Sequence, residues 1–574
     1  MTGGARLLVE ALVRHGVDTV FGFPGDTSIA LYDVLHDRSD AIRHVLARDE
    51  RHAGFMADAY TRTTRRLGVC EASSGAGAVY LASGLAEALA ASVPLLAVTT
   101  DNNRRSRGTS PISEVDQERL FAACTKWRRT VERPADIPDL VARAVAAATG
   151  GRPGPAALII PEDVLEESAD PPPPVHAPER RALVPGRRPA APAEAVATAG
   201  AGLAAASRPV AVAGGGAHLS GAGRELTLLA EHLAMPVATT VHGKGAIDEA
   251  HPLALGVVGG NGARDDANAE VAAADLVLFV GTRANATDTL GFTVPPRGVP
   301  RVLHIDAAAE RAGRTYPGAL PLVGDARTVL AALRAATQAA SEADRARRAA
   351  ELAAARAAWA AAEDPPPVTA EGVLPPRALV RELRAAFGRD TWVVADAGTP
   401  TPYLACHWEA PGDGWRVVIP RGHGPMGYAV PASVGVAVGH PGARVLCLTT
   451  ENSLAMSVGE WETAVRLGLP ITYVVLDNTS LAWIKMIQHL YARQRYFAVD
   501  PGPLDPVHLG LGTGIAGARA HTVEGFAALA ERAAARRDGP SLIHARVPEH
   551  MAAPPPVPVW RAALTGESTG RPIH

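Results

Sequence analysis

Short apolar runs alternate with longer Ala-rich segments of helical periodicity along the whole chain. Apolar runs of this kind are typical of buried strands, and the segments between them are long enough to form covering helices. Strands that alternate with helices indicate parallel sheets with helices packed on both faces. We therefore expect an α/β fold whose strands include residues 18–23, 156–160, 210–213, 276–280, 392–395, 445–448 and 471–476.

Two stretches interrupt this alternation. Residues 168–192 contain a proline run at 171–174, and an Ala/Arg-rich helix near 345–362 is followed by prolines at 365–367. Proline-rich stretches favour linkers, and a chain of 574 residues is too long for one hydrophobic core. We expect three doubly wound parallel-sheet domains and a peripheral Pro-rich tail, with boundaries at 1–168, 190–340, 372–550 and 551–574.

Charge and composition narrow the choice of partners. Lys and Arg total 56 against 59 for Asp and Glu, and a net charge of -3 provides no strong field for nucleic acid or an anionic membrane. A small-molecule partner is favoured. The four cysteines lie far apart, which predicts buried thiols in a reducing compartment. Residues 1–15 lack a signal-peptide pattern and no segment is apolar over a bilayer's width, so we expect a cytoplasmic protein.

Two glycine turns and one glutamate stand out in the first third of the chain. Pro24 and Gly25 follow the strand 18–23, and Ser74 and Gly75 lie in a second turn that leads into an apolar helix. Open α/β sheets bind ligands at such strand ends, although one glycine turn alone is a weak signal. Glu50 begins a helix between them, where a simple helix-capping role is the ordinary interpretation.

Similar turns follow the strands of the last third. Asp396 to Thr399 follow one strand, residues 422–428 precede a helix, Glu451 follows another strand, and Asn478 ends the next one. In this order and spacing, the motifs of the chain resemble those of thiamine-diphosphate-dependent enzymes, in particular the acetolactate synthase branch. The resemblance extends from about residue 16 to 549.

The resemblance gives Glu50 a catalytic role. In the family, the glutamate at this position hydrogen-bonds the aminopyrimidine ring of the cofactor and promotes the imino tautomer that removes the thiazolium proton. A carboxylate buried against an apolar ring has a raised pKa, so it can share a proton with a ring nitrogen near neutral pH. Glu50 is therefore the strongest single candidate.

The resemblance also assigns the cofactor contacts. Gly424 would offer its carbonyl to the cofactor's amino group and Met426 would force the cofactor into its bent shape, although a methionine is also ordinary core filler. Residues 479–489 are expected to form a helix over the thiazolium. The full set of predicted cofactor-binding residues is Pro24, Gly25, Ser74, Gly75, Gly398, Thr399, Gly424, Met426, Asn452, Ser453, Trp483 and Ile484.

The metal motif departs from the family pattern. A diphosphate needs a divalent cation with oxygen ligands, preferably Mg²⁺, and the resemblance assigns these ligands to Glu451, Asn478 and Ser480. The family's Gly-Asp-Gly has become Thr450, Glu451 and Asn452, and the longer glutamate would displace the metal unless the loop retreats. Asparagine tolerates a positive φ, so the backbone at Asn452 could still reach the phosphate.

The substrate residues also differ from those of the family. Asp49 stands where the family has a histidine, and Ser113 stands where it has a glutamine, so pyruvate does not follow as the substrate. Lys485 fits either a ligand for a substrate carboxylate or a solvated surface lysine. The candidate substrate residues are Asp26, His52, Ser113, His423 and Lys485.

The resemblance implies a lyase or transferase that decarboxylates a 2-oxo acid and passes the acyl carbanion to a carbonyl acceptor, as a carboligase does. The alternatives are a non-oxidative 2-oxo acid decarboxylase, in which a proton replaces the acceptor, and a scaffold that has lost thiamine diphosphate. Acetolactate synthase itself holds FAD in the middle domain, where Gly214 to Gly216 form a nucleotide-binding type of turn; a structural Rossmann-like domain without flavin is favoured here. The family site lies between two subunits, which implies a homodimer or homotetramer.

Overall fold

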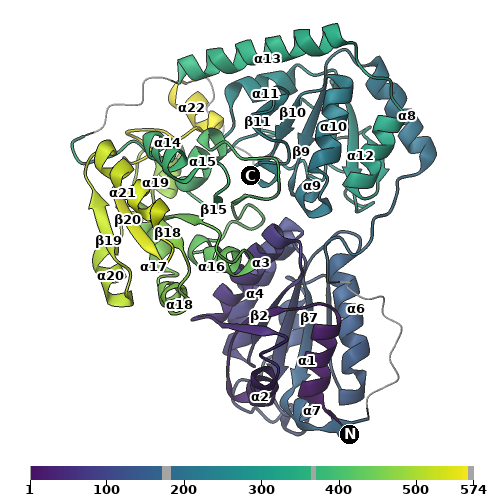
Figure 1. Ribbon diagram of the computed structural model, residues 1–574, viewed down its shortest axis with the longest axis vertical. Coiled ribbons are helices and arrows are strands. Elements are labelled where there is room, and N and C mark those ends of the chain that lie inside the picture. The colour runs from purple at the N-terminus through teal and green to yellow at the C-terminus, as the bar shows by residue number, and fades with distance from the viewer. Residues whose placement is uncertain (1, 171–181, 364–369, 567–574) are drawn as a thin grey trace. The chain divides into compact units, whose positions relative to one another are not determined.

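The computed structural model describes residues 2–170, 182–363 and 370–566. The proline runs at 171–174 and 365–367 and the end of the tail lie outside these described residues. The strands form three six-stranded parallel sheets, each with its own apolar core (Figure 1). The predicted α/β class with three doubly wound sheets is confirmed, and each predicted strand matches an observed one to within two residues.

The N-terminal sheet has the strand order β3-β2-β4-β5-β7-β6. Its strands are β2 (Thr19–Phe23), β3 (Arg43–Leu46), β4 (Gly68–Ala72), β5 (Leu95–Asp101), β6 (Trp127–Thr130) and β7 (Ala156–Pro161), and a short β1 (Thr2–Gly3) pairs with β8 (Ser168–Ala169). Its helices are α1 (Gly4–Arg14), α2 (Ile29–Asp37), α3 (Glu50–Thr64), α4 (Ala76–Ala91), α5 (Gln117–Phe121), α6 (Ile137–Thr149) and α7 (Glu162–Glu166). The chain leaves β2 toward β3 and then crosses to β4, so the ends of β2 and β4 form the switch point where such sheets bind ligands.

The central sheet has the order β11-β10-β9-β12-β13-β14, the connectivity of a Rossmann fold. Its strands are β9 (Pro209–Ala213), β10 (Val237–Thr239), β11 (Ala254–Val257), β12 (Leu276–Val280), β13 (Arg301–Asp306) and β14 (Leu320–Val323). The helices are α8 (Ala193–Ala205), α9 (Gly215–Ser220), α10 (Gly223–Leu233), α11 (Asp265–Ala272) and α12 (Ala326–Ala335). The long helix α13 (Glu342–Ala362) packs on α11 (Figure 1) and corresponds to the predicted Ala/Arg-rich helix.

The C-terminal sheet repeats the connectivity of the N-terminal one, with the order β16-β15-β17-β18-β20-β19. Its strands are β15 (Trp392–Ala395), β16 (Val417–Val418), β17 (Val445–Thr450), β18 (Ile471–Asp477), β19 (Gly517–Ala520) and β20 (Ser541–Arg546). Its helices include α14 (Pro376–Phe387), α15 (Pro400–His407), α17 (Glu451–Ala455), α19 (Ala482–Tyr491), α20 (Pro506–Thr513) and α21 (Val523–Ala535). Because β17 pairs with both β15 and β18, the turns after these three strands meet at one edge of the sheet.

The chain forms two compact units. The N-terminal unit contains residues 1–187, 420–441 and 457–469, and the C-terminal unit contains residues 188–419, 442–456 and 470–574. Helices α16 (Ala429–Gly439) and α18 (Glu460–Arg466) therefore belong to the N-terminal unit, where α16 packs along α3. Their place after β16 and β17 in the chain did not predict this.

The tail differs from the expectation that it is peripheral. Residues 558–564 form α22 (Pro558–Leu564), whose Trp560 is only 2% exposed and packs on Trp483 with 4.3 Å between the ring centroids. Trp560 and Val557 form an apolar cluster with Met486 of α19, and burial of this apolar surface holds the segment in place. The prediction of a peripheral tail is therefore wrong for residues up to Leu564.

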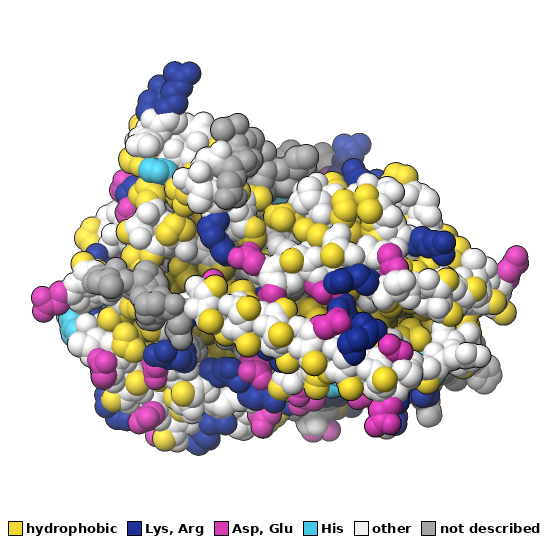
Figure 2. Space-filling view, turned by 90° about the horizontal axis from the view of Figure 1, so that it is seen from above, with side chains coloured by type: hydrophobic (Ala, Val, Ile, Leu, Met, Phe, Trp, Pro, Cys, Tyr) yellow, Lys and Arg dark blue, Asp and Glu magenta, His cyan; other side chains and the backbone are white. Residues whose placement is uncertain are grey.

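Two predictions about composition can be compared with the structure. All four cysteines are buried free thiols, as the sequence predicted. Basic and acidic side chains are interspersed over the face seen in Figure 2, which agrees with a net charge near zero. Among the described residues, no helix combines the length and apolar character needed to cross a membrane.

Candidate active site

Glu50 is the first residue of α3, as the sequence predicted. Asp49 caps this helix, because its Oδ1 accepts a hydrogen bond from the Arg51 backbone N–H at 2.8 Å. Burial raises the pKa of the Glu50 carboxyl, and the charge of Asp49 acts in the same direction. Gly77 of α4 leaves room for this carboxylate, since a Cβ there would lie 2.9 Å from Glu50 Oε1. The carboxyl is thus held at a helix N-terminus, with its pKa raised above the ordinary value by burial.

The turns after β2 and β4 lie together at the switch point. A Cβ on Gly25 would clash with Ser73, so this glycine allows the two turns to approach each other. Ser74 Oγ lies 2.9 Å from Ser113 Oγ and accepts a hydrogen bond from Thr27 Oγ1 at 3.2 Å. Gly75 adopts a φ of +65° and contacts Ser113. The structure therefore joins the predicted cofactor residues Ser74 and Gly75 to the predicted substrate residue Ser113.

The other candidates from this unit have different surroundings. Pro24 and Asp26 are exposed at the turn after β2. His52 is buried, and its Nδ1 lies 3.0 Å from Glu460 Oε1 of α18, which also accepts a hydrogen bond from the Arg48 N–H at 2.8 Å. His52 therefore already has a carboxylate partner, whereas Pro24 and Asp26 face solvent.

A second buried carboxyl lies near Glu50. Glu71 of β4 is fully buried and accepts a hydrogen bond from the Tyr32 hydroxyl at 2.6 Å. Burial and the charge of the nearby Glu50 together raise the pKa of Glu71 to about 8. The sequence held a signal for this residue, since Glu71 is the one charged residue of the strand GVCEA.

The loop that carries Gly424 and Met426 is anchored by a buried glutamate. Glu87 Oε2 accepts hydrogen bonds from the backbone N–H groups of His423 at 2.6 Å and Gly424 at 3.1 Å, and Oε1 accepts one from Gly422 at 3.0 Å. Arg62 donates to Glu87 at 2.9 Å and pairs with Asp58 at 2.7 Å. Glu87 is the one charged residue of α4, a signal that sequence reasoning overlooked.

This anchoring leaves the predicted groups of the loop accessible. The His423 side chain is exposed and Met426 is half-buried. Gly424 has a φ of +78°, a conformation in the left-handed region that favours glycine. The loop conformation is fixed by Glu87, while the residues predicted to contact cofactor remain at the surface of the unit.

The ends of β15, β17 and β18 carry the candidate residues of the C-terminal unit. Asn478 Nδ2 donates to Thr399 Oγ1 at 3.3 Å, which joins the turns after β18 and β15. Thr399 Oγ1 also lies 3.0 Å from Nε2 of the buried His550. Gly398 has a φ of +107°, and apart from its two chain neighbours no described residue has an atom within 4 Å of the position of a Cβ on it. An open glycine turn of this kind allows a ligand to approach the backbone closely.

Glu451 and Ser480 present buried oxygens to this edge. Glu451 Oε2 and Ser480 Oγ are buried without a hydrogen-bond partner among the described residues. Burial raises the pKa of Glu451 to about 8, and the charge of Asp477 adds to this effect. Buried polar atoms normally have partners, so unsatisfied oxygens here fit a site built to receive a cation or a polar ligand. These donors are of the type that Mg²⁺ prefers.

The Asn452 amide lies between two of the predicted metal ligands. Its Nδ2 donates to Glu451 Oε1 at 2.8 Å and to the Ser480 carbonyl at 3.1 Å. Asn452 lies within α17, which Thr450 caps by accepting the Ser453 N–H at 3.3 Å. Its backbone is therefore helical, and the expectation that it uses a positive φ is wrong, because the chain enters a capped helix directly after β17.

Helix α19 holds the last group of candidates and begins later than predicted. Thr479 has a φ of +56°, which is incompatible with a right-handed helix, so α19 starts at Ala482. Trp483 packs on Trp560, while Ile484 is 46% exposed. Lys485 Nζ forms ion pairs with Asp500 at 2.7 Å and Glu549 at 2.8 Å.

His550 was not anticipated from the sequence. It follows the last strand, is 1% exposed, and its Nδ1 has no hydrogen-bond partner among the described residues. Burial lowers the pKa of His550 to about 3, so the ring is neutral and orients Thr399 as a hydrogen-bonding group rather than as a charge. No motif in the surrounding residues pointed to it.

Comparison with known proteins agrees with this geometry. Residues 2–120, 196–333 and 396–545 match the N-terminal TPP binding, central and C-terminal TPP binding domains of thiamine pyrophosphate enzymes. The chain is 32% identical over 514 residues to an acetolactate synthase of Arthrospira platensis, covering 87% of this chain and 86% of the relative. It is also 32% identical to the acetolactate synthase isozyme 2 large subunit of Escherichia coli over 498 residues, covering 86% of both chains. A probable acetolactate synthase large subunit of Methanocaldococcus jannaschii is 32% identical over 519 residues, covering 87% of this chain and 84% of the relative.

Proposed function

Because the chain belongs to the thiamine pyrophosphate enzyme family, as an acetolactate-synthase-like carboligase, we propose that Glu50 and the edge formed by β15, β17 and β18 carry its reaction. The reaction is decarboxylation of a 2-oxo acid and transfer of the acyl group to a carbonyl acceptor. When bound, thiamine diphosphate supplies a thiazolium carbon that stabilises the electron pair left behind by carbon dioxide. The chain must bind and orient the reactants, exclude water and move one proton.

Glu50 is proposed to move that proton. Its carboxyl lies at the start of α3 beside Gly77, and burial raises its pKa, which favours exchange of a proton with a ring nitrogen. Ser74 and Gly75 would support the pyrimidine side, together with Pro24 and Gly25. Ser113, which shares a hydrogen bond with Ser74, is the favoured substrate contact in this unit.

The edge of the C-terminal sheet is proposed to hold the diphosphate and Mg²⁺. The open turn at Gly398 and Thr399, with Asn452 and Ser453 at the start of α17, would face the diphosphate. Glu451, Asn478 and Ser480 would supply oxygen ligands to Mg²⁺, a choice supported by the unsatisfied Glu451 Oε2. The unsatisfied Glu451 Oε2 would accept the cation directly, whereas a cation that also bound Glu451 Oε1 or the Ser480 carbonyl would have to displace the Asn452 amide.

Two further segments would shape the site. Gly424 and Met426 would contact the cofactor from a loop that Glu87 holds in place. Trp483 and Ile484 of α19 would cover it. Lys485 Nζ donates to Asp500 and Glu549, which leaves its third N–H for a substrate carboxylate.

Asp26, His52 and His423 are the remaining proposed substrate contacts. Asp26 and His423 are exposed, so a substrate could reach them without displacing a protein partner. His52 would have to share its Nδ1 with Glu460. Exchange of each residue for alanine, with KM measured for donor and acceptor separately, would assign these contacts.

We propose that the central domain carries no flavin. Trp415 occupies the space outside the glycine turn after β9, because a Cβ on Gly215 would lie 3.0 Å from its ring, and His218 stacks on it with 5.2 Å between the ring centroids. Gly214 and Gly216 pack against Thr282 and Gly281. These glycines serve protein packing, which does not fit close approach of a dinucleotide. The visible absorption spectrum of the purified protein tests this point.

The assembly and location complete the proposal. By the family resemblance, the N-terminal segment of one subunit and the C-terminal segment of another form each site, so we propose a homodimer or homotetramer in the cytoplasm. Sedimentation of the purified protein at several concentrations would test the assembly. A protein that stays monomeric under conditions of full activity would contradict it.

Isothermal titration with thiamine diphosphate in the presence and absence of Mg²⁺ tests the cofactor site. We expect saturable binding that requires Mg²⁺, little change for Glu50→Gln, and loss of the Mg²⁺ requirement or of binding for Glu451→Gln. Absence of binding at about millimolar cofactor would favour a scaffold that has lost thiamine diphosphate. Release of carbon dioxide from a panel of 2-oxo acids, with analysis of the products, then separates a carboligase from a simple decarboxylase.

A further inference from the structure

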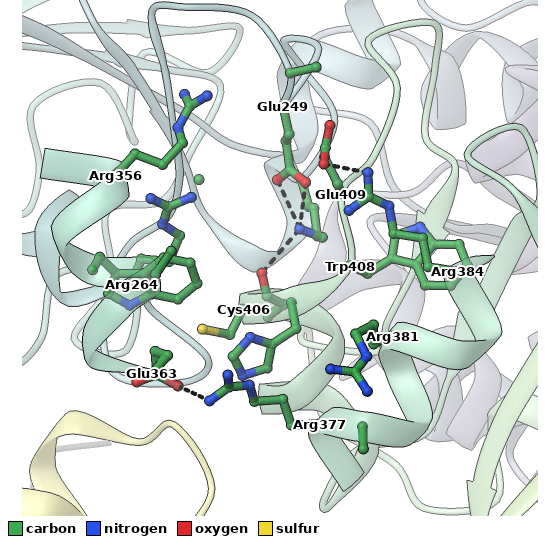
Figure 3. A pocket seen from close by; sticks show the side chains of 18 residues that line it. Glu249, Arg264, Arg356, Glu363, Arg377, Arg381, Arg384, Cys406, Trp408 and Glu409 are labelled. Atoms are coloured by element: carbon green, nitrogen blue, oxygen red, sulfur yellow. Dashed lines mark hydrogen bonds and ion pairs between the residues drawn. The ribbon is translucent and has the colours of Figure 1, made fainter. Parts of the chain in front are cut away.

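A cavity in the C-terminal unit is lined by residues that have no role in the proposed reaction. Its volume is about 620 Å³, and it is lined by α13, α14, the end of α15 and the segments around Lys244 and Arg264 (Figure 3). Small-molecule sites commonly have volumes of about 300–1,000 Å³, so the cavity is large enough for a ligand of nucleotide size.

The lining of this cavity is strongly basic. Six cationic side chains face three carboxylates, an excess of three positive charges. Burial lowers the pKa of the lining His407 to about 3, so this histidine adds no charge. The cations are Lys244, Arg264, Arg356, Arg377, Arg381 and Arg384, and the carboxylates are Glu249, Glu363 and Glu409. In a chain with a net charge of -3, such an excess is a local feature rather than a property of the whole surface.

Helical spacing explains how the arginines converge. Arg377, Arg381 and Arg384 are separated by one turn each and therefore share one face of α14. Arg356 and Trp359 share a face of α13 in the same way. Figure 3 shows Arg356 and Arg264 on one side of the cavity and Arg381 and Arg384 on the other. A ligand in the cavity would have cationic groups on both sides.

The three carboxylates are already engaged by three of the cations. Lys244 pairs with Glu249 at 2.7 Å and Arg384 with Glu409 at 2.5 Å, while Arg377 contacts Glu363 at 3.4 Å. The dashed contacts in Figure 3 mark these interactions. The excess charge therefore rests on Arg264, Arg356 and Arg381.

Of the remaining cations, Arg264 and Arg381 have acidic partners outside the lining. Arg264 pairs with Asp266 at 2.6 Å and lies 4.1 Å above the Trp359 ring, while Arg381 contacts its neighbour Glu382 at 3.1 Å. Arg381 is 67% exposed, so that pair contributes little.

Arg356 carries the least compensated charge. It is half-buried and donates to the backbone carbonyls of Ala254 at 2.6 Å and His251 at 3.3 Å, and no ion pair among the described residues involves it. Desolvation and the nearby Arg264 lower its pKa by more than the carboxylates of Asp266, Glu409 and Glu249 raise it. A partly buried cation without an anionic partner is costly, and an anion in the cavity would relieve that cost.

We propose that this cavity binds a small organic anion with at least two phosphate or carboxylate groups. One anionic group would lie at Arg356 and Arg264, and another at Arg381 and Arg384 on the opposite wall. Guanidinium groups suit both phosphate and carboxylate because they offer paired N–H donors. The site would be separate from the groups proposed to hold thiamine diphosphate, and its occupation does not depend on the proposed reaction.

Calorimetric titration of the protein saturated with thiamine diphosphate and Mg²⁺ tests the proposal. The probes are inorganic pyrophosphate, ADP and citrate, which distinguish phosphate from carboxylate ligands. Prior saturation keeps pyrophosphate out of the proposed cofactor site. We expect at least one probe to bind, with affinity about tenfold weaker in Arg381→Gln and Arg356→Gln, since one lost charge-assisted contact is worth about 1.5 kcal/mol.

Arg345→Gln is the matched control, because Arg345 is an exposed arginine of the same α13 that does not line the cavity. Its affinity for the probe should equal that of wild type. Arg356→Gln loses contacts to backbone carbonyls, which can lower its melting temperature. Arg381 is largely exposed, so Arg381→Gln should fold as wild type does and tests the proposal independently. Binding of none of the three probes, or binding that is equal in all variants, would overturn the proposal.

Discussion

The Asn452 amide occupies the position between two proposed metal ligands, so its removal should tighten metal binding. Nδ2 donates to Glu451 Oε1 at 2.8 Å and to the Ser480 carbonyl at 3.1 Å. A cation that binds these oxygens must break both hydrogen bonds. The perturbation is Asn452→Ala, because alanine deletes the amide and retains the helical conformation of α17.

The size of the effect follows from these two contacts. Above about pH 8, where Glu451 is ionised, its hydrogen bond with Asn452 contributes about 1.5–3 kcal/mol, and the neutral bond to the Ser480 carbonyl contributes about 0.5–1.5 kcal/mol. Release of the asparagine side chain recovers roughly 1 kcal/mol of rotamer entropy. Displacement of Asn452 therefore costs about 2 kcal/mol of metal-binding free energy, so metal affinity should rise about thirtyfold in Asn452→Ala.

Electron paramagnetic resonance of free Mn²⁺, titrated in the presence of thiamine diphosphate, measures this affinity without relying on turnover. Glu451→Gln serves as the opposite control, since it removes a ligand charge and should weaken Mn²⁺ binding. Unchanged or weaker Mn²⁺ binding in Asn452→Ala would refute the reasoning and assign the amide to the diphosphate instead of to a competing position.

Three further predictions concern stability. Glu87→Gln should cost about 3 kcal/mol, because it removes the buried charge that Arg62 and three loop N–H groups share; an unchanged melting temperature would contradict this. Burial raises the pKa of Glu71 in the folded protein to about 8, whereas its pKa in the unfolded chain is about 4.3. The protonated Glu71 therefore stabilises the fold fully below about pH 4.3, and this contribution is lost as the pH rises through about 8. Between about pH 5 and pH 8, the free energy of unfolding measured by denaturant titration should fall by up to about 3 kcal/mol more in wild type than in Glu71→Gln. Equal pH dependence of the two proteins would disprove the assignment. Trp560→Ala should lower stability by about 3–5 kcal/mol and weaken cofactor binding through Trp483, whereas a truly peripheral tail would show neither effect.

The strands and the start of α3 could be predicted because their signals are local. Strands buried on both faces of a parallel sheet are continuous apolar runs, which the sequence displays directly. Asp49 supplies the cap that begins α3 at Glu50. The same local reasoning failed at Thr479, whose left-handed backbone delays the start of α19, and at Asn452, whose backbone is helical because Thr450 caps α17.

The features that could not be predicted depend on contacts between distant residues. The support of the 422–428 loop by Glu87 joins segments more than three hundred residues apart, and its only local signal is one charge in an apolar helix. The basic cavity combines faces of α13 and α14 that become one surface only after folding. The sequence places Trp560 in a proline-rich tail, and its contact with Trp483 becomes evident only in the folded structure.

Exchange of the thiazolium proton of bound thiamine diphosphate with deuterated water, measured by NMR, tests the central claim most directly. Glu50 is proposed to set the rate of this exchange without holding the cofactor. We therefore predict that Glu50→Gln binds thiamine diphosphate about as tightly as wild type but slows the exchange by about 10²–10⁴-fold. Equal exchange rates in wild type and Glu50→Gln would contradict the proposed role of Glu50.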